Sequence, residues 1–109
     1  MKNVVDLALE PKSVIKRARH VVNAHSARVK IPTDIHTRAK TVDVSISEVW
    51  RCLEEGQLTQ APVRNGFSHI CIELSAMIAG RSVLVTAALD ETGDHAVLHV
   101  THADIEQEG

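Results

Sequence analysis

Residues 69–88, HICIELSAMIAGRSVLVTAA, carry an apolar side chain at every second position on both sides of Gly80. A period of two is typical of a β-strand with one buried face, so this stretch predicts two strands joined at Gly80. A third strand is expected over His95–Thr101, after the turn signal DETGD at residues 90–94. Gln57–Val63 predicts a fourth, ahead of the hairpin signal Asn65-Gly66.

Helical spacing precedes these strands. A short helix is expected over residues 3–10, ended by Pro11, and Ser13 is the expected N-cap of the next helix. The apolar side of that second helix consists of Val14, Ala18, Val21, Val22 and His25. Ser45 and Glu48 then form a capping-box pattern, and Gly56 is placed to end the helix that follows.

The inward face of this last helix is predicted to contain Ile46, Val49, Trp50 and Leu53, with Trp50 as a core anchor against the sheet. The expected architecture is an α+β domain in which two or three N-terminal helices precede a four-stranded antiparallel β-sheet. One sheet face is covered by the helices and the other is partly open.

Composition limits the class of protein. A chain of 109 residues, 44% hydrophobic and 24% charged, predicts a single domain over residues 1–109 and contains no apolar run long enough for a membrane span. Asp6 interrupts the only apolar stretch near the start, so a secretory signal is not expected and a cytoplasmic location is the default. Cys52 and Cys71 lack metal-ligand spacing and predict buried free thiols.

Charge is divided unevenly along the chain. Residues 11–42 carry a formal charge of +7, whereas residues 43–109 carry −8. Such a division is typical of a surface for a polyanion such as nucleic acid, and equally of two halves of one domain that attract each other. The helix expected after Ser13 is both amphipathic and basic, and its outer side would suit RNA phosphates.

An ordered set of motifs carries a family resemblance. The motifs are His36, Arg38 and Lys40, then VSISEVWRCLEEGQL at 44–58, APV at 61–63, HICIEL at 69–74, AGR at 79–81 and HVTH at 99–102. This pattern, over about residues 35–103, resembles a bacterial domain family of unknown function related to the RelE and BrnT toxins of toxin–antitoxin pairs. Residues 1–30 fall outside it as an N-terminal helical extension.

The resemblance implies a RelE/BrnT-like fold, an antitoxin-like protein partner and metal-independent endoribonuclease activity. Such cleavage needs a base, an acid and cations for the phosphate. The candidate base and acid residues are His36, His99 and His102, and the candidate phosphate-binding residues are Arg38, Lys40 and Arg81. The acidic second half departs from the basic character of these toxins.

The histidines also have other interpretations. His95 and His99 are expected on one strand face and His102 on the other, so this spacing predicts no metal site, and no cofactor is expected. For His36 the favoured interpretation is a structural role, as a helix-terminal residue packed against or hydrogen-bonded to the sheet.

A second class of function is a non-catalytic protein-interaction module of the same fold, which acts as a homodimer or with a protein partner. The acidic tail, the absence of Tyr with a single Phe, and an available sheet edge favour it.

Overall fold

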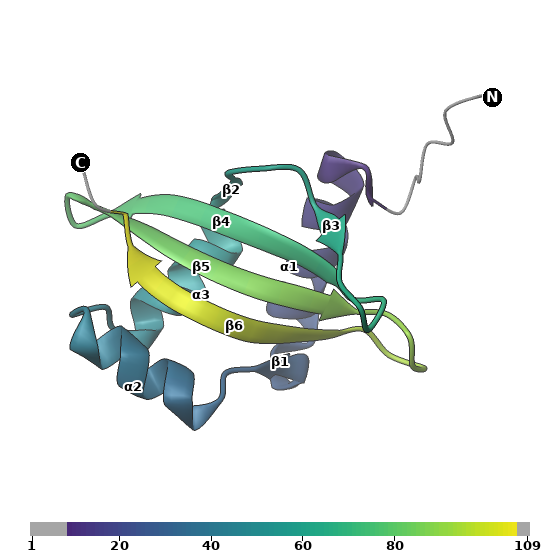
Figure 1. Ribbon diagram of the computed structural model, residues 1–109, viewed down its shortest axis with the longest axis horizontal. Helices are drawn as coiled ribbons and strands as arrows, with labels where there is room; N and C mark the ends of the chain where they lie inside the picture. The colour runs from purple at the N-terminus through teal and green to yellow at the C-terminus, as the bar shows by residue number, and fades with distance from the viewer. Residues whose placement is uncertain (1–8, 107–109) are drawn as a thin grey trace.

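The computed structural model describes residues 9–106, which form three α-helices and one sheet, and this confirms the α+β class. The helices are α1 (Pro11–Ala24), α2 (Thr33–Thr41) and α3 (Ile46–Glu55), with a short 3-10 turn, η2 (Ser26–Arg28), after α1. The strands are β1 (Val29–Lys30), β2 (Gln57–Leu58), β3 (Val63–Arg64), β4 (Ile70–Ile78), β5 (Arg81–Asp90) and β6 (Val97–Ile105). Figure 1 shows α1 and α3 behind the three long strands and α2 beside β6.

The expected four-stranded antiparallel sheet is wrong in strand number and in direction. The sheet is mixed and six-stranded, in the order β1-β6-β5-β4-β2, and β3 also pairs with β4. β1 runs parallel to β6, where Val29 is buried and Lys30 exposed. The single strand expected over Gln57–Val63 is divided into β2 and β3. Pro62 stands between them, and a proline cannot donate a ladder hydrogen bond.

The two-strand prediction around Gly80 is confirmed. Ala79 and Gly80 make the turn with positive φ values of 54° and 79°, which suits the twist of a two-residue hairpin connection. From this turn β4 and β5 pair without interruption, from Ile78 opposite Arg81 to Ile70 opposite Leu89. The alternating side chains of both strands therefore divide cleanly between a face covered by α3 and the opposite face, here called the open face.

β6 contains an irregularity that changes the orientation of its histidines. His99 lies opposite Ala88 and His102 opposite Thr86, with a shift of register between Thr86 and Ala87. The partner strand thus has one residue fewer than β6 over this interval, and the extra residue is Thr101. The predicted placement of His99 and His102 on opposite faces is therefore wrong, since both lie on the open face.

α1 begins earlier than expected. Its N-cap is Glu10, whose carboxylate accepts the backbone N–H of Ser13 at 2.8 Å, so Ser13 lies inside the first turn and not at the cap. A carboxylate at this position satisfies one of the free N–H groups at the helix start, and Pro11 suits the first helical position. The predicted buried side of α1 is confirmed, with His25 half-buried at the C-cap. Residues 3–8 of the helix expected over 3–10 lie outside the described residues.

α3 is the best-specified helix. The capping box is present in both directions, with Glu48 N–H donating to Ser45 Oγ at 3.1 Å and Ser45 N–H to Glu48 Oε1 at 2.9 Å. Val49, Cys52 and Leu53 are buried, but Trp50 is only half-buried at the edge of the core, so its expected role as the anchor is wrong. The helix presents its Val49–Cys52–Leu53 side to the sheet, and Trp50 is turned away from the centre of that side.

Both cysteines are free thiols, as predicted, although only Cys52 is fully buried and Cys71 is half-buried. Burial raises the pKa of the Cys52 thiol to about 11. Cys52 is therefore a neutral core side chain.

Two ion pairs join the basic and the acidic parts of the chain. Arg17 Nε lies 2.8 Å from Glu91 Oε2, and Arg38 lies 2.6 Å from Asp104 Oδ2. Two basic side chains of residues 11–42 are thus paired with carboxylates of the acidic part inside the fold. Over residues 9–106, no helix is long and apolar enough to cross a membrane.

Gly56 ends α3 at a crowded position. A Cβ placed there would lie 2.5 Å from the carbonyl oxygen of Cys52 and 3.1 Å from Cβ of Leu74. Gly56→Ala should therefore lower the free energy of unfolding by about 1–3 kcal/mol, as overpacking does. Gly93→Ala is the matched control, because a Cβ there meets nothing within 4 Å. Urea unfolding of the two variants measures the difference, and equal midpoints would contradict the crowding.

Candidate functional site

Two histidines and an aspartate converge on the open face, near the β5–β6 turn. His69 Nε2 lies 3.4 Å from Asp90 Oδ2, and His99 Nε2 lies 3.9 Å from the same oxygen. The two imidazole rings stack, with centroids 5.8 Å apart and an angle of 8° between their planes. His69, Asp90 and His99 are called the histidine–aspartate cluster below. Its members are partly exposed, with 22%, 23% and 40% of their side chains accessible.

Local structure holds the cluster in place. The N–H and the hydroxyl of Thr92 both donate to Asp90 Oδ1, at 2.9 and 2.5 Å, so Oδ2 remains for the imidazoles. These Thr92 bonds, and after them the charges of His69 and His99, lower the pKa of Asp90. A carboxylate that stays ionised can orient the N–H of an imidazole.

His69 is positioned by the loop before β4. This loop spans residues 65–69, so Asn65-Gly66 belongs to a longer connection than the expected two-residue turn. Asn65 Oδ1 accepts hydrogen bonds from the N–H groups of Phe67 and His69 at 2.8 and 3.1 Å. These bonds stabilise the longer loop in place of a two-residue turn. The Phe67 ring lies 6.1 Å from that of His69.

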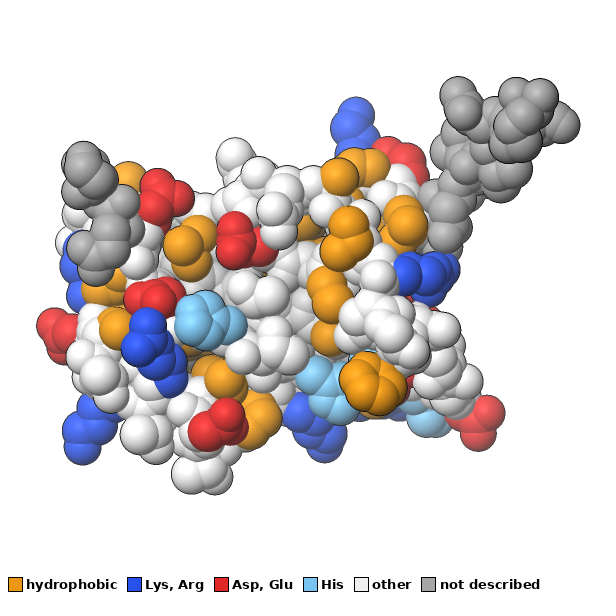
Figure 2. Space-filling model, in the orientation of Figure 1, with side chains coloured by type: hydrophobic (Ala, Val, Ile, Leu, Met, Phe, Trp, Pro, Cys, Tyr) orange, Lys and Arg blue, Asp and Glu red, His pale blue; other side chains and the backbone are white. Residues whose placement is uncertain are grey.

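A second group lies further along β6. Arg38 reaches from α2 to Asp104 at 2.6 Å, and His102 Nε2 lies 3.4 Å from the same carboxylate oxygen. The hydrogen bond from Arg38, followed by that from the N–H of Ile105, lowers the pKa of Asp104. The irregularity at Thr101 places His102 on the same face as His99. Figure 2, which views the open face, shows histidine side chains there with Lys and Arg mainly around the margin.

The remaining candidates lie elsewhere. His36, Lys40 and Arg81 line a hollow of about 500 Å³ at the connection between α2 and α3. Arg81 there contacts both carboxylate oxygens of Glu48 at 3.3 Å and lies 3.9 Å from Asp43, so its guanidinium is engaged by carboxylates. The structure thus separates the six candidates into His99, His102 and Arg38 on the open face and His36, Lys40 and Arg81 in this hollow.

His36 does not have the structural role expected for it. It lies within α2, is exposed, and is neither helix-terminal nor packed against the sheet. The reason is the side of α2 that packs inward, which is formed by Ile35 and Ala39. Residue 36 follows Ile35 by one position, and neighbouring residues of a helix point about 100° apart.

Two members of the cluster, His69 and Asp90, were not among the candidates from sequence. Their signal lay in the hairpin itself, because a two-residue turn at Ala79–Gly80 sets residue 69 opposite residue 90 if the pairing is extended by one step. Among residues 9–106, no three His, Cys, Asp or Glu side chains are arranged to hold a metal ion.

Comparisons of the chain with protein-family models, with curated proteins and with solved structures give no match. The relationship to the RelE and BrnT toxins therefore stays a prediction from sequence. The site has to be interpreted from its own geometry.

Proposed function

We propose that this protein cleaves RNA as a metal-independent endoribonuclease of the RelE-like toxin type, and that the histidine–aspartate cluster supplies its acid and its base. The observation that carries the proposal is the approach of His69 and His99 to one carboxylate on an accessible sheet face. RNA cleavage needs one proton taken up and one delivered, and two imidazoles can perform both transfers near neutral pH.

The reaction uses the RNA's own 2′-hydroxyl. A neutral imidazole takes its proton, the 2′-oxygen attacks the adjacent phosphorus, and the bond from phosphorus to the 5′-oxygen breaks. The leaving 5′-oxygen receives a proton from the second, protonated imidazole, so the products are a 2′,3′-cyclic phosphate and a 5′-hydroxyl end. Asp90 is a positioning residue that orients the imidazoles.

Charge on the phosphate requires a cation at the site. Among the candidate residues from sequence, His102 lies on the open face of β6 and Arg38 reaches that face from α2, where its side chain is 44% exposed beside Asp104. A guanidinium can contact a phosphate with its outer N–H groups while it remains paired with a carboxylate. This proposal does not include Lys40, Arg81 or His36, because they line the hollow at the connection between α2 and α3.

Induced expression in a bacterial host, with growth and total RNA followed together, tests the proposal. We expect growth arrest and RNA fragments, and purified protein should produce cyclic phosphate ends in the presence of a chelator. Normal growth with intact RNA would overturn it.

A second candidate function is a non-catalytic module that binds a protein partner or a second copy of itself. Three large apolar side chains near β3 and β4 favour it, since Val63, Phe67 and Met77 are 55%, 76% and 72% exposed. β4 is also only briefly covered by the two-residue strands β2 and β3. The expression experiment separates the two functions, because a binding module leaves RNA intact.

A further inference from the structure

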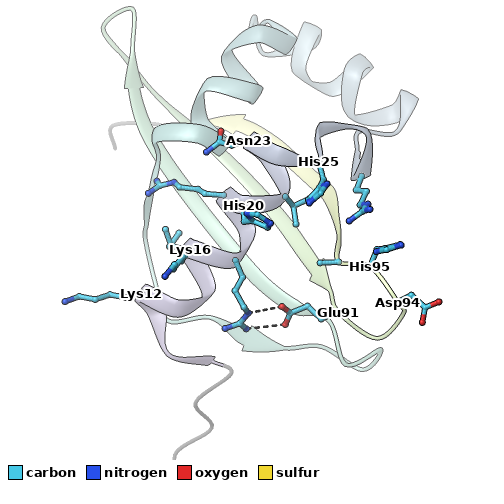
Figure 3. Close-up of a pocket in the computed structure, with 14 residues that line it drawn as sticks. Lys12, Lys16, His20, Asn23, His25, Glu91, Asp94 and His95 are labelled. Carbon is cyan, nitrogen blue, oxygen red and sulfur yellow. Dashed lines mark hydrogen bonds and ion pairs between the residues drawn. The ribbon is translucent and has the colours of Figure 1, made fainter.

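A groove of about 860 Å³ runs between α1 and the turn that joins β5 to β6. Figure 3 shows Lys12, Lys16, His20 and Asn23 following one another along α1, with His95 and Asp94 on the far side. This α1 groove is separate from the histidine–aspartate cluster, none of whose members lines it. It is also lined by Ile15, Arg17, Arg19, Arg28, Glu91 and Ala96.

The groove carries excess positive charge. Its five lysines and arginines face two carboxylates, and one of these carboxylates, Glu91, is already paired with Arg17 at 2.8 Å. Lys12, Lys16 and Arg28 form no ion pair with any residue in the described part of the chain. Three cations therefore remain to meet an anion from outside.

The positive charge of the groove also affects the protonation of His25. Burial lowers the pKa of His25, and Arg28, His20 and His95 around it lower the pKa further. The His20 and His25 rings meet edge to face with centroids 5.2 Å apart. Near neutral pH, His25 therefore stays uncharged beside cations that lack a partner.

The arrangement fits a chain of phosphates better than one small anion. Lys12, Lys16 and His20 follow at four-residue intervals, and four residues advance a helix by about 6 Å along one side. A row at this spacing can follow successive phosphates of an extended strand, with apolar atoms of Ile15 and Ala96 under the bases or sugars.

The groove and the cluster meet at one turn of the chain. Asp90 belongs to the cluster and Glu91, the next residue, lines the groove. His95 lines the groove just before β6, which carries His99. A strand held along α1 would therefore leave the groove beside the end of β5, where Asp90, the proposed positioning carboxylate, is located.

We infer that the α1 groove binds the phosphodiester backbone of a single-stranded segment of RNA. The choice of RNA as the ligand rests on the proposed function, whereas the groove and its charge do not. The basic division of the chain, residues 11–42, thus supplies a backbone-binding surface through α1, outside the part that resembles the toxin family.

Fluorescence anisotropy with a labelled 12-nucleotide 2′-O-methyl RNA tests this inference. The 2′-O-methyl group removes the nucleophile, so binding is measured whether or not the protein cleaves RNA. The test variant is Lys12→Gln/Lys16→Gln, and its matched control is Lys40→Gln/Arg51→Gln. The control removes the same charge from exposed positions outside the groove.

At 0.1 M salt the test variant should bind about 10- to 30-fold more weakly than the parent. The slope of log K against log salt concentration should be smaller in magnitude by about 1.4, because the variant has lost two phosphate contacts and its binding releases fewer counterions. The control should bind like the parent. No binding by the parent at 50 mM salt, equal weakening in both variants, or displacement of the oligonucleotide by an equimolar amount of ATP would each overturn the inference.

The outcomes also separate this inference from the proposed function. Groove-dependent binding by a protein that never cleaves RNA would retain the groove and reject the nuclease. If cleavage depends on His99 but binding does not depend on Lys12 and Lys16, the nuclease proposal is retained and the groove is rejected as the binding site.

Discussion

His99→Gln should lower the rate of RNA cleavage by about 10²- to 10⁴-fold, the contribution expected of one positioned proton-transfer group. Glutamine keeps a polar side chain of similar size but cannot exchange a proton near neutral pH. The His99 side chain is 40% exposed, lies 3.9 Å from Asp90 and stacks on the His69 ring, so little buried packing is lost. The melting temperature should therefore remain within the range of a neutral surface change.

His69→Gln should cause a loss of the same order, since His69 shares the same carboxylate oxygen. His36→Gln is the matched control, because this exposed histidine of α2 lines the separate hollow. Initial rates on a defined oligoribonucleotide and thermal unfolding of each variant provide the measurements. An active His99→Gln variant, or an equal loss in His36→Gln, would remove the cluster from the reaction.

Leu53→Ala should lower the free energy of unfolding by about 2–5 kcal/mol, since the substitution removes apolar burial and leaves a cavity. Leu53 is 1% exposed on the side of α3 that packs on β4 and β5. A loss of this size should lower the melting temperature by about 10 °C or more in a domain of this length. Calorimetry or circular dichroism on heating provides the measurement.

Trp50→Ala is the informative comparison, because tryptophan is larger but Trp50 is only half-buried. We expect it to destabilise the protein less than Leu53→Ala does. The opposite order would mean that the tryptophan is the anchor after all and that α3 is rotated relative to the described packing.

Local sequence determined much of the fold. The period-two pattern on both sides of Gly80 specified the β4–β5 hairpin, and the pair Ser45–Glu48 specified the start of α3, because both signals act over a few neighbouring residues. The same hairpin register sets His69 opposite Asp90, so the local signal for two of the three cluster members was present in the sequence although neither was among the candidates.

Long-range packing decided the rest. The extra residue Thr101 in β6, which turns His102 to the face of His99, has no local signature because a bulge is defined by the strand opposite. The pairing of β1 with β6 brings together Val29 and Leu98, which are far apart in sequence.

The candidate site likewise depends partly on local sequence and partly on long-range packing. Sequence proposed His36, Lys40 and Arg81 beside His99, yet α2 and the start of β5 place these three in a separate hollow at the connection between α2 and α3. The order of motifs along a chain specifies residue types and local structure. Which of those residues share a surface depends on how helices pack on the sheet, and that was decided only by burial of Ile35, Val49 and the rest of the common core.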